Sequence, residues 1–426
     1  MRKIKRIAGR LIKIKTRLKR KKIKMAKNKF SSKNNEGLVS HSLAKIKVVG
    51  VGGGGGNAVH RMKNDFIKGV EFIAINTDAQ DLAHCDVPYK IHIGKNLTRG
   101  LGTGMNPELG RQAAEETKAE IIEALKGADL VFITAGLGGG TGTGAAPIIA
   151  EAAKELGALT IAVVTKPFSF EGAQRNRVAQ DGLAKLKDKV DTLIVVPNDR
   201  IFAVVSKDTS IIKAFEVVDD VLRCAVEGIA DLVAMPGIVN VDFADVRAIM
   251  QDAGTAIVGL GVASSQDRGV KAISQAIHSP LLEYSIDGAK GVLFGIFGGK
   301  DLKMSEINDI ARIISETIDP GAKVIFGAYY DKKMRPGFIK VTVIATGFSG
   351  LNSGKMMSQP PSTLFGVSEP DKKINFQESL NTKSVNELKN ENNYAGSRLA
   401  DKQVKKKNPD EVWDIPAFLR RGKNKK

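Results

Sequence analysis

The fold of this chain is decided by a stretch that runs Gly136-Leu137-Gly138-Gly139-Gly140-Thr141-Gly142-Thr143-Gly144. Residues 128–135 before it form an apolar run of strand length, and residues 145–154 after it predict a helix with Pro147 near its start. Glycine lets backbone N–H groups approach a ligand closely, and a helix N-terminus adds partial positive charge. This strand, glycine loop and helix therefore predict an anion site, most often one for phosphate.

A second unit of the same kind precedes the first. Residues 45–51 predict a strand, and the glycines 52–56 lead into a helix start at 57–62. Gly50, Gly52 and Gly55 match G-x-G-x-x-G, a dinucleotide motif that is weak when it stands alone. The next predicted strand ends at Asn76 and Asp78, about 20 residues further on, where a ribose-binding acid lies in a Rossmann unit. At this point a dinucleotide fold and another phosphate-binding fold both remain open.

Strands and helices continue to alternate, with helices near 106–126 and 172–187 and strands near 159–164 and 192–196. This alternation predicts a parallel sheet covered by helices on both faces, with ligands bound outside the carboxyl ends of the strands. Both glycine loops fall at that edge. The polar residues expected beside them are Asn76, Glu171, Arg175 and Asn198.

A long amphipathic helix is predicted from Asp208 to about Ala234. Phe215 and Asp219 share one face of it, and such a pair can stack on a base and hydrogen-bond its edge. Packing of Phe215 in the core is the simpler interpretation. Asp219 on the same face is harder to bury without a partner.

The next helix opens with Asn240, Asp242 and Asp245. Asp242 as N-cap with Asp245 as its capping-box partner is one interpretation; the other is a pair of carboxylates that hold a cation and orient water. A second, smaller α/β domain follows, with helices at 269–278 and 304–317 and strands that we expect at 291–298, 322–330 and 338–346.

The ends of the chain differ from the middle. Of the net charge of +19, sixteen positive charges lie within residues 1–33, so the rest of the chain is nearly balanced. This basic, amphipathic tail is compatible with an anionic membrane, nucleic acid, a transit peptide or simple disorder, and Met25 is a possible alternative start. Residues 350–408 predict a flexible linker, and the apolar island around Trp413 is typical of a docking peptide. Cys85 and Cys224 have no metal-type spacing and indicate buried thiols in a reducing compartment.

No G-x-x-x-x-G-K-[ST] occurs, so the chain is not a P-loop NTPase, and the phosphates are expected to be held by backbone N–H groups and a metal ion. From about residue 45 to 348 the sequence resembles the tubulin/FtsZ family of GTPases. The segments that carry the resemblance are Gly138–Gly144, Gly52–Asn57, Asn76-Thr77-Asp78, Pro167–Arg175, Asn198-Asp199-Arg200, Phe215 with Asp219, and Asn240–Asp245. The basic N-terminal extension departs from the usual short start of that family.

The resemblance implies a role for each motif. GTP or GDP, with Mg²⁺, would be the cofactor, and Asn198 and Asp219 would recognise guanine while Phe215 stacks on it. Glu171 and Arg175 would bind ribose or phosphate. The other expected cofactor-binding residues are Gly53, Gly54, Gly55, Gly56, Asn57, Asn76, Gly138, Gly139, Gly140, Thr141, Gly142 and Thr143. Asn240, Asp242 and Asp245 would be the catalytic residues, acting in the pocket of a neighbouring subunit stacked head to tail. No residue is assigned as a metal ligand.

The resemblance also implies a Rossmann-like GTPase domain, a long central helix, a smaller α/β C-terminal domain and disordered tails. The expected domains are 1–44 as basic extension, 45–208 as nucleotide-binding domain, 209–237 as central helix, 238–348 as GTPase-activating domain, 349–408 as linker and 409–426 as adaptor-binding peptide. The chain itself would be the first partner, in filaments of a cytoplasmic, mid-cell division ring. Membrane-tethering adaptors and regulatory division proteins would bind through Asp414, Ile415, Pro416, Phe418, Leu419 and Arg420. No specific nucleic acid is expected, and membrane contact would be indirect or through the basic tail.

Two alternatives compete with this interpretation. An NAD(P)-dependent oxidoreductase rests on G-x-G-x-x-G and Asp78, but no hydride-transfer site is evident. A filament protein of the same fold that does not hydrolyse nucleotide is the other. Binding of GTP without binding of NAD(P) would exclude the oxidoreductase. Release of phosphate would exclude the filament protein that does not hydrolyse nucleotide.

Overall fold

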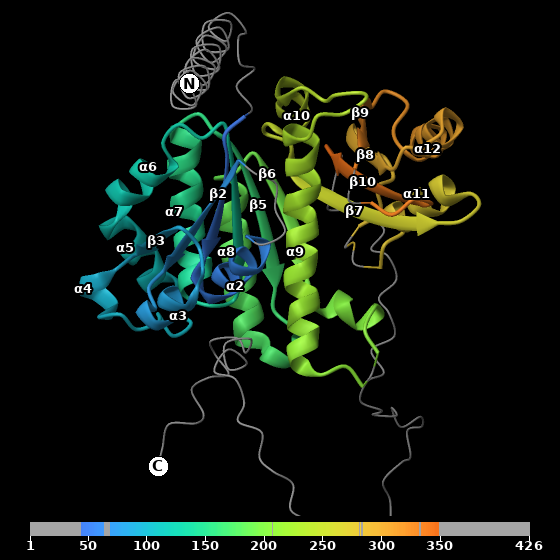
Figure 1. Cartoon of the computed structure of the whole chain (residues 1–426). Helices are drawn as coiled ribbons and strands as arrows, with labels where there is room; N and C mark the ends of the chain where they lie inside the picture. Colours follow the sequence, from blue (N-terminus) through green and yellow to red (C-terminus); the bar gives the residue numbers. More distant parts are fainter. Residues whose placement is uncertain are drawn as a thin grey trace, which may run out of the picture.

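The structure is a computed structural model that describes residues 44–63, 69–206, 208–280, 282, 284–331 and 334–348. Within these residues, ten strands form one sheet in the order β3-β2-β1-β4-β5-β6-β7-β10-β8-β9. The strands are β1 (Ile46–Val51), β2 (Val70–Asn76), β3 (Tyr89–His92), β4 (Leu130–Gly136), β5 (Leu159–Lys166), β6 (Thr192–Pro197), β7 (Gly254–Ser264), β8 (Gly291–Gly298), β9 (Lys323–Tyr330) and β10 (Phe338–Thr346). The sheet crosses the whole molecule (Figure 1).

The predicted parallel sheet is confirmed for the first part of the chain. β1 lies between β2 and β4, with Ile46 opposite both Val70 and Leu130, and all pairs from β3 to β7 are parallel. β10 is antiparallel to β7 and β8, so the second part is mixed. The strand β7 was not predicted, because Gly259 and Gly261 interrupt its apolar pattern. These glycines let helix α11 (Arg268–Ile277) approach, since a Cβ on either would lie within 2.1 Å of a backbone oxygen of that helix.

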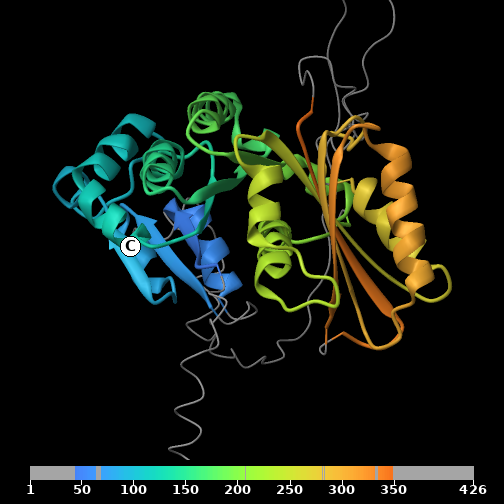
Figure 2. The same cartoon turned by 90° about the horizontal axis from the view of Figure 1, so that it is seen from above.

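Helices cover both faces of the sheet (Figure 2). The helices are α2 (Gly52–Met62), α3 (Ala79–His84), α4 (Lys95–Thr98), α5 (Pro107–Glu116), α6 (Lys118–Leu125), α7 (Thr141–Glu155), α8 (Ala173–Lys187), α9 (Ile211–Ala234), α10 (Phe243–Met250), α11 and α12 (Met304–Thr317), with 3₁₀ turns η1 (Ser169–Glu171) and η2 (Asn198–Ala203). The long helix predicted to end near Ala234 is confirmed as α9.

Three sequence predictions about helices need correction. The segment 106–126 forms two helices, α5 and α6, with a break at Thr117, whose side chain donates to the carbonyl of Ala113. The helix after the glycine loop begins at Thr141, four residues early, so Pro147 lies inside it. The glycines at 52–56 form the first turn of α2 instead of a loop, because Gly52 (φ 68°) turns the chain directly out of β1.

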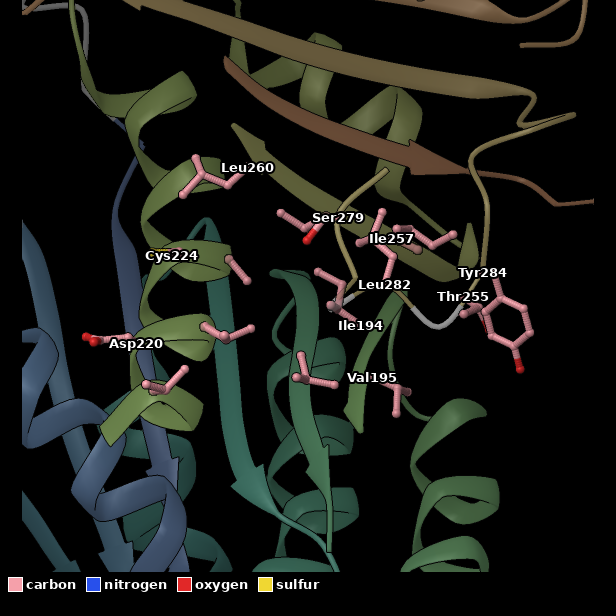
Figure 3. Close-up of a pocket in the computed structure, with 16 residues that line it drawn as sticks. Ile194, Val195, Asp220, Cys224, Thr255, Ile257, Leu260, Ser279, Leu282 and Tyr284 are labelled. Carbon is pink, nitrogen blue, oxygen red and sulfur yellow. The ribbon is translucent and has the colours of Figure 1, made fainter. Parts of the chain in front are cut away.

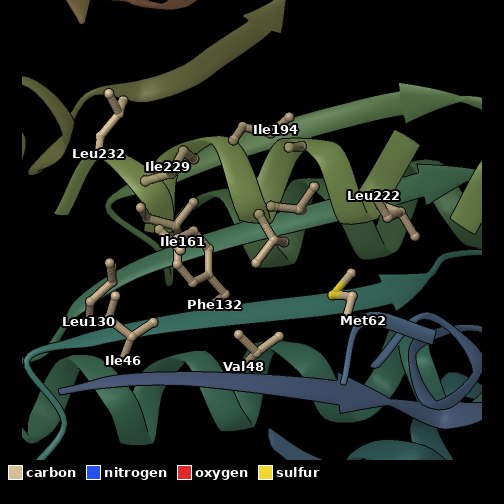
Figure 4. Packing of buried hydrophobic residues seen from close by; sticks show 14 of the residues in the cluster. Ile46, Val48, Met62, Leu130, Phe132, Ile161, Ile194, Leu222, Ile229 and Leu232 are labelled. Carbon is tan, nitrogen blue, oxygen red and sulfur yellow. The ribbon is translucent and has the colours of Figure 1, made fainter. Parts of the chain in front are cut away.

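Alternation along the strands builds two cores, one on each face of the sheet. Val48 and Phe132 face α2 and α9, whereas their neighbours Val49 and Ile133 face α5 to α8. Figure 4 shows the first of these cores between α9 and the strands. The same core continues onto β8 and β10, so α9 packs against both halves of the sheet.

Polar contacts also attach α9 to the second half of the sheet. Tyr329 in β9 donates from its hydroxyl to the carbonyl of Leu232 at 2.8 Å, and Lys340 in β10 pairs with the buried Asp231 at 3.0 Å. The domain boundaries at residues 208, 237 and 348 therefore remain a prediction. Among the described residues, no helix has the length and apolar character needed to cross a membrane.

Candidate nucleotide site

A cleft of about 820 Å³ lies at the carboxyl ends of β1, β4, β5 and β6, large enough for a nucleotide. Its walls come from α2, the loop before α7, η1, the start of α8, and α9. The strands place these elements together because parallel strands end at one edge of the sheet. Figure 1 shows that edge at the lower side of the sheet, beside α2 and α3.

One end of the cleft is built for an anion. Both α2 and α7 begin there, and Gly53, Gly139 and Gly142 line it, so backbone N–H groups are available without side chains in the way. Thr141 is held by hydroxyl contacts to Thr77 at 2.7 Å and to Thr103 at 3.1 Å. These contacts fix the start of α7, whose partial positive charge favours phosphate.

The other end of the cleft holds the residues expected to recognise a base. Phe215 lines it and also packs edge-on against Phe168, with ring centroids 5.3 Å apart, so core packing and a stacking role are both compatible with its position. Asn198 is buried beside the cleft, and its Oδ1 has no hydrogen-bond partner among the described residues. A buried acceptor without a partner is costly, so this atom fits a ligand that donates a hydrogen bond to it.

Asp219 lines the same end of the cleft on α9. Burial raises its pKa to about 7, although the neighbouring Arg61 opposes that rise. The Arg61 Nε lies 3.2 Å from Asp219 Oδ2. The carboxylate that sequence analysis described as hard to bury alone thus has a cationic partner from α2.

Glu171 and Arg175 form an ion pair across the turn from η1 to α8, with Nη1 and Oε2 2.9 Å apart. Glu171 also accepts from the backbone N–H of Phe168 at 2.8 Å. Both residues line the cleft. The pair presents fixed polar groups to the middle of the cleft, where a sugar would lie between phosphates and base.

The structure brings together most of the predicted binding residues. Those that line the cleft are Gly53, Gly54, Asn57, Asn76, Gly139, Gly140, Thr141, Gly142, Glu171, Arg175, Asn198, Phe215 and Asp219. Gly55, Gly56, Gly138 and Thr143 lie behind its wall. Thr143 Oγ1 accepts from the N–H of Gly138 at 2.9 Å, and a Cβ on Gly55 would lie 2.2 Å from the carbonyl oxygen of Thr134.

Asn240, Asp242 and Asp245 do not line the cleft. They lie just before or in the first turn of α10, a helix that Figure 1 shows beside the C-terminal end of α9. Asp242 is the N-cap of α10, and its side chain accepts from the N–H of Ala244 at 3.4 Å. Asn240 accepts from the N–H of Gly237 at 2.5 Å. From Asp219 to the end of α9 is about 22 Å at 1.5 Å per residue, so one chain does not join these carboxylates to its own cleft.

Several cleft residues were missed by sequence analysis, above all Arg61, Thr103 and Met105. A signal was present for the last two, since Gly100-Leu101-Gly102-Thr103-Gly104 is another glycine-rich turn. Its left-handed backbone at Gly100, Gly104 and Met105 returns the chain to the cleft. Arg61 follows the glycines by one helical turn, where an arginine is an ordinary surface residue.

A second cavity of about 200 Å³ lies on the other side of α9, between α9, β6 and β7 (Figure 3). It is mostly apolar, with Cys224, Ile257 and Leu282 in its lining. Asp220 lies at the edge of this cavity with its carboxylate turned away from it (Figure 3), whereas its neighbour Asp219 lines the nucleotide cleft. None of the predicted site residues lines it.

The sheet, the two helix N-termini and the cleft without a P-loop lysine define a nucleotide-binding α/β protein outside the P-loop class. Residues 45–206 match the sequence model described as the Tubulin/FtsZ family, GTPase domain, and residues 254–349 match that of the FtsZ family, C-terminal domain. The chain therefore belongs to the FtsZ family and is a cytoskeletal GTPase of the cell-division type. The oxidoreductase alternative has no support.

Solved structures agree with this membership. An empty FtsZ dimer from M. jannaschii is 45% identical, with a TM-score of 0.70 over 74% of this chain and 92% of that chain. A mutant FtsZ from M. jannaschii, solved separately, is also 45% identical, with a TM-score of 0.69 over 74% and 95%. CetZ2 from Haloferax volcanii, solved as a GTPγS-bound protofilament, is 23% identical with a TM-score of 0.61 over 71% and 92%, which shows the fold alone.

Proposed function

We propose that this chain binds GTP in the cleft, stacks head to tail with copies of itself, and hydrolyses the nucleotide where two copies meet. The observation that carries the proposal is the separation of the cleft from Asp242 and Asp245 at opposite ends of α9. The cleft of one molecule and the carboxylates of another together form a complete hydrolytic site only where the two molecules meet. Such a heterologous contact repeats without closing and produces an open filament.

Within the cleft, Gly53, Gly54, Gly139, Gly140 and Gly142 bind phosphates through backbone N–H groups. Glu171 and Arg175 contact ribose or phosphate. At the base end, the two oxygens of an ionised Asp219 accept from N1–H and the 2-amino group of guanine, while Phe215 stacks on the ring. Adenine has no such pair of donors on that edge, which explains the preference for guanine.

Asn240, Asp242 and Asp245 then act in the neighbour's cleft, where they position the attacking water. Asp242 and Asn240 are exposed and Asp245 is half-buried at the first turn of α10, so all three are presented on the surface. Apolar side chains accompany both ends: Ile238 is 72% exposed near the carboxylates, and Leu101 is 65% exposed near the cleft. Exposed apolar groups at both ends favour a buried contact between copies.

Mg²⁺ is proposed to accompany GTP. Among the described residues, no group of three or more acidic, His or Cys side chains is arranged to hold a metal ion. The ion would therefore bind mainly to phosphate oxygens and water, which is the usual manner of Mg²⁺ with nucleotides. It would neutralise charge on the phosphates.

The remaining partners concern segments outside the described residues. We propose that Asp414, Ile415, Pro416, Phe418, Leu419 and Arg420 bind membrane-tethering and regulatory division proteins. The proposed location is the cytoplasmic face of the division site at mid-cell. The basic segment 1–44 is proposed to add at most an electrostatic contact to the membrane.

Sedimentation with GTP, with GDP or without nucleotide tests the proposed assembly. GTP should move the protein to the pellet, and GDP should not. Phosphate release per subunit should rise from near zero above a threshold protein concentration, because the complete site exists only in the polymer. Full turnover by a verified monomer would contradict the proposal.

Replacement of Asp219 by asparagine should reduce the affinity for GDP by about 100-fold, since charge-assisted hydrogen bonds contribute about 1.5–3 kcal/mol each. The amide of the new side chain offers one acceptor and one donor. Xanthosine diphosphate has a 2-oxo group in place of the 2-amino group and should therefore bind the variant better than GDP does. Calorimetric titration measures both affinities.

Asp220→Asn is the matched control, because it removes the same charge from the adjacent position, whose side chain is exposed and does not line the nucleotide cleft. It should bind GDP at least as well as the unaltered protein does, because loss of this charge removes one of the groups that raise the pKa of Asp219. Unchanged GDP binding by Asp219→Asn would show that another group recognises the base.

A further inference from the structure

The proposed function assigns no role to Arg61, a charged residue of the cleft. It projects from α2 toward α9, where its Nε lies 3.2 Å from Asp219 Oδ2 and its Nη1 lies 3.9 Å from Glu216 Oε1. Arg61 is 29% exposed and Asp219 15%, so their contact is only partly screened by water. Arg61 also lines the cleft itself.

The charged groups nearest to Asp219 are two carboxylates and one arginine. Burial is the main cause that raises the pKa of Asp219 to about 7, and Asp220 and Glu216 on α9 add to the rise. Glu216 is itself paired with Lys213 at 2.7 Å. The other charged or titratable groups that line the cleft are His60 of α2, Asp78, Asp81 and His84 at α3, Cys85, and the Glu171–Arg175 pair. Among the described residues, Arg61 is the one group that acts to lower the pKa of Asp219.

The protonation state of Asp219 decides which bases it can recognise. An ionised carboxylate accepts two hydrogen bonds, which match N1–H and the 2-amino group of guanine. A protonated carboxyl keeps one acceptor and turns a donor toward the 2-amino group, which is also a donor. In that state the 2-amino group no longer favours binding, and guanine loses its advantage over hypoxanthine.

We propose that Arg61 is a specificity-determining residue that keeps the Asp219 carboxylate ionised and turned toward the guanine edge. It acts through Asp219 and is thus a positioning residue, and the proposal rests on the proposed role of Asp219 in guanine recognition. The ion pair holds one carboxylate oxygen from the α2 side. The carboxylate then reaches the ligand already charged, at a pH where burial alone would protonate it.

The test measures the affinity for GDP and for inosine diphosphate, which lacks the 2-amino group, by calorimetric titration between pH 6 and pH 9. GDP prevents hydrolysis from complicating the result. For the unaltered chain, the affinity for GDP should fall about tenfold per pH unit below an inflection near pH 7. Ionisations of the nucleotide are common to all variants, so differences between curves report on Asp219.

Arg61→Met should move this inflection up by about one to three pH units, the usual effect of an adjacent opposite charge. At pH 7 the variant should bind GDP about tenfold more weakly or worse, with little preference over inosine diphosphate. Between pH 7 and pH 9 both its affinity and its preference should rise toward those of the unaltered chain. Arg61→Lys should follow the unaltered curve closely. Arg312→Met, which removes the same charge from an exposed position on α12, should change nothing.

The outcomes separate this inference from its premise. If Asp219→Asn loses GDP binding but Arg61→Met follows the unaltered pH curve, the role of Arg61 is wrong and guanine recognition by Asp219 stands. If Arg61→Met weakens binding equally at every pH, Arg61 acts through shape or through the phosphates, and the inference is also wrong. Normal GDP binding by Asp219→Asn would overturn both. Arg61→Gln replaces the methionine variant if thermal unfolding shows that the latter does not fold.

Discussion

Asp245→Ala is expected to bind GTP as tightly as the unaltered chain does and to release almost no phosphate. The residue lies in the first turn of α10, away from the cleft, so its loss leaves the groups that line the cleft in place. A residue that positions water or moves its proton contributes about 10²- to 10⁴-fold to a rate, and phosphate release should fall by that factor. Asp309→Ala, at another aspartate on α12, should leave turnover unchanged.

A mixture of two inactive variants makes the same prediction sharper. Asp219→Ala damages the cleft and keeps Asp245, whereas Asp245→Ala keeps the cleft and lacks the carboxylate. Where the cleft of the second variant meets α10 of the first, one complete site forms between them. Phosphate release should therefore reappear on mixing, although each variant alone is inactive. A mixture as inactive as its components would show that both groups must belong to one chain.

The fold was largely predictable because its strands and helices carry their own periodic signals. The expected bounds of β8, β10 and α12 match the structure, since each is a regular apolar or amphipathic segment limited by turn residues. The errors occur where tertiary contacts override local pattern. The glycines in β7 are required by the close approach of α11. The helices α2 and α7 begin inside glycine runs because neighbouring strands and helices hold those glycines in place.

The site was predictable where glycines and polar residues follow strands, because topology alone brings those positions to one edge. Arg61 was not predictable from the sequence, because an arginine in a helix gives no distinctive signal. Its role depends on the carboxylate of Asp219, which is far away in the sequence. The unpartnered oxygen of Asn198 likewise becomes visible only once the surrounding atoms are placed. Roles that depend on which groups surround a side chain in space, such as those of Arg61 and Asn198, therefore require a structure.

Replacement by alanine should affect stability at one glycine of the central loop and helix, and ligand binding at another. A Cβ on Gly144 would lie 1.9 Å from the carbonyl oxygen of Pro107 and 2.7 Å from the backbone nitrogen of Arg111, both in α5. Backbone atoms within a helix cannot give way as a side-chain end can. Gly144→Ala should therefore separate α5 from α7 and lower the free energy of unfolding by about 3 kcal/mol, the upper end of overpacking costs, in denaturant titrations.

Gly139→Ala should leave stability within about 0.5 kcal/mol, because a Cβ there meets no atom within 4 Å. Gly139 lines the anion end of the cleft, so the added methyl group would occupy space that a phosphate needs. The affinity for GTP should fall while the unfolding curve stays in place. Undiminished GTP binding would show that the phosphates do not approach this loop. Because the two positions lie close together in one loop and helix, the pair distinguishes glycine required by the ligand from glycine required by helix packing.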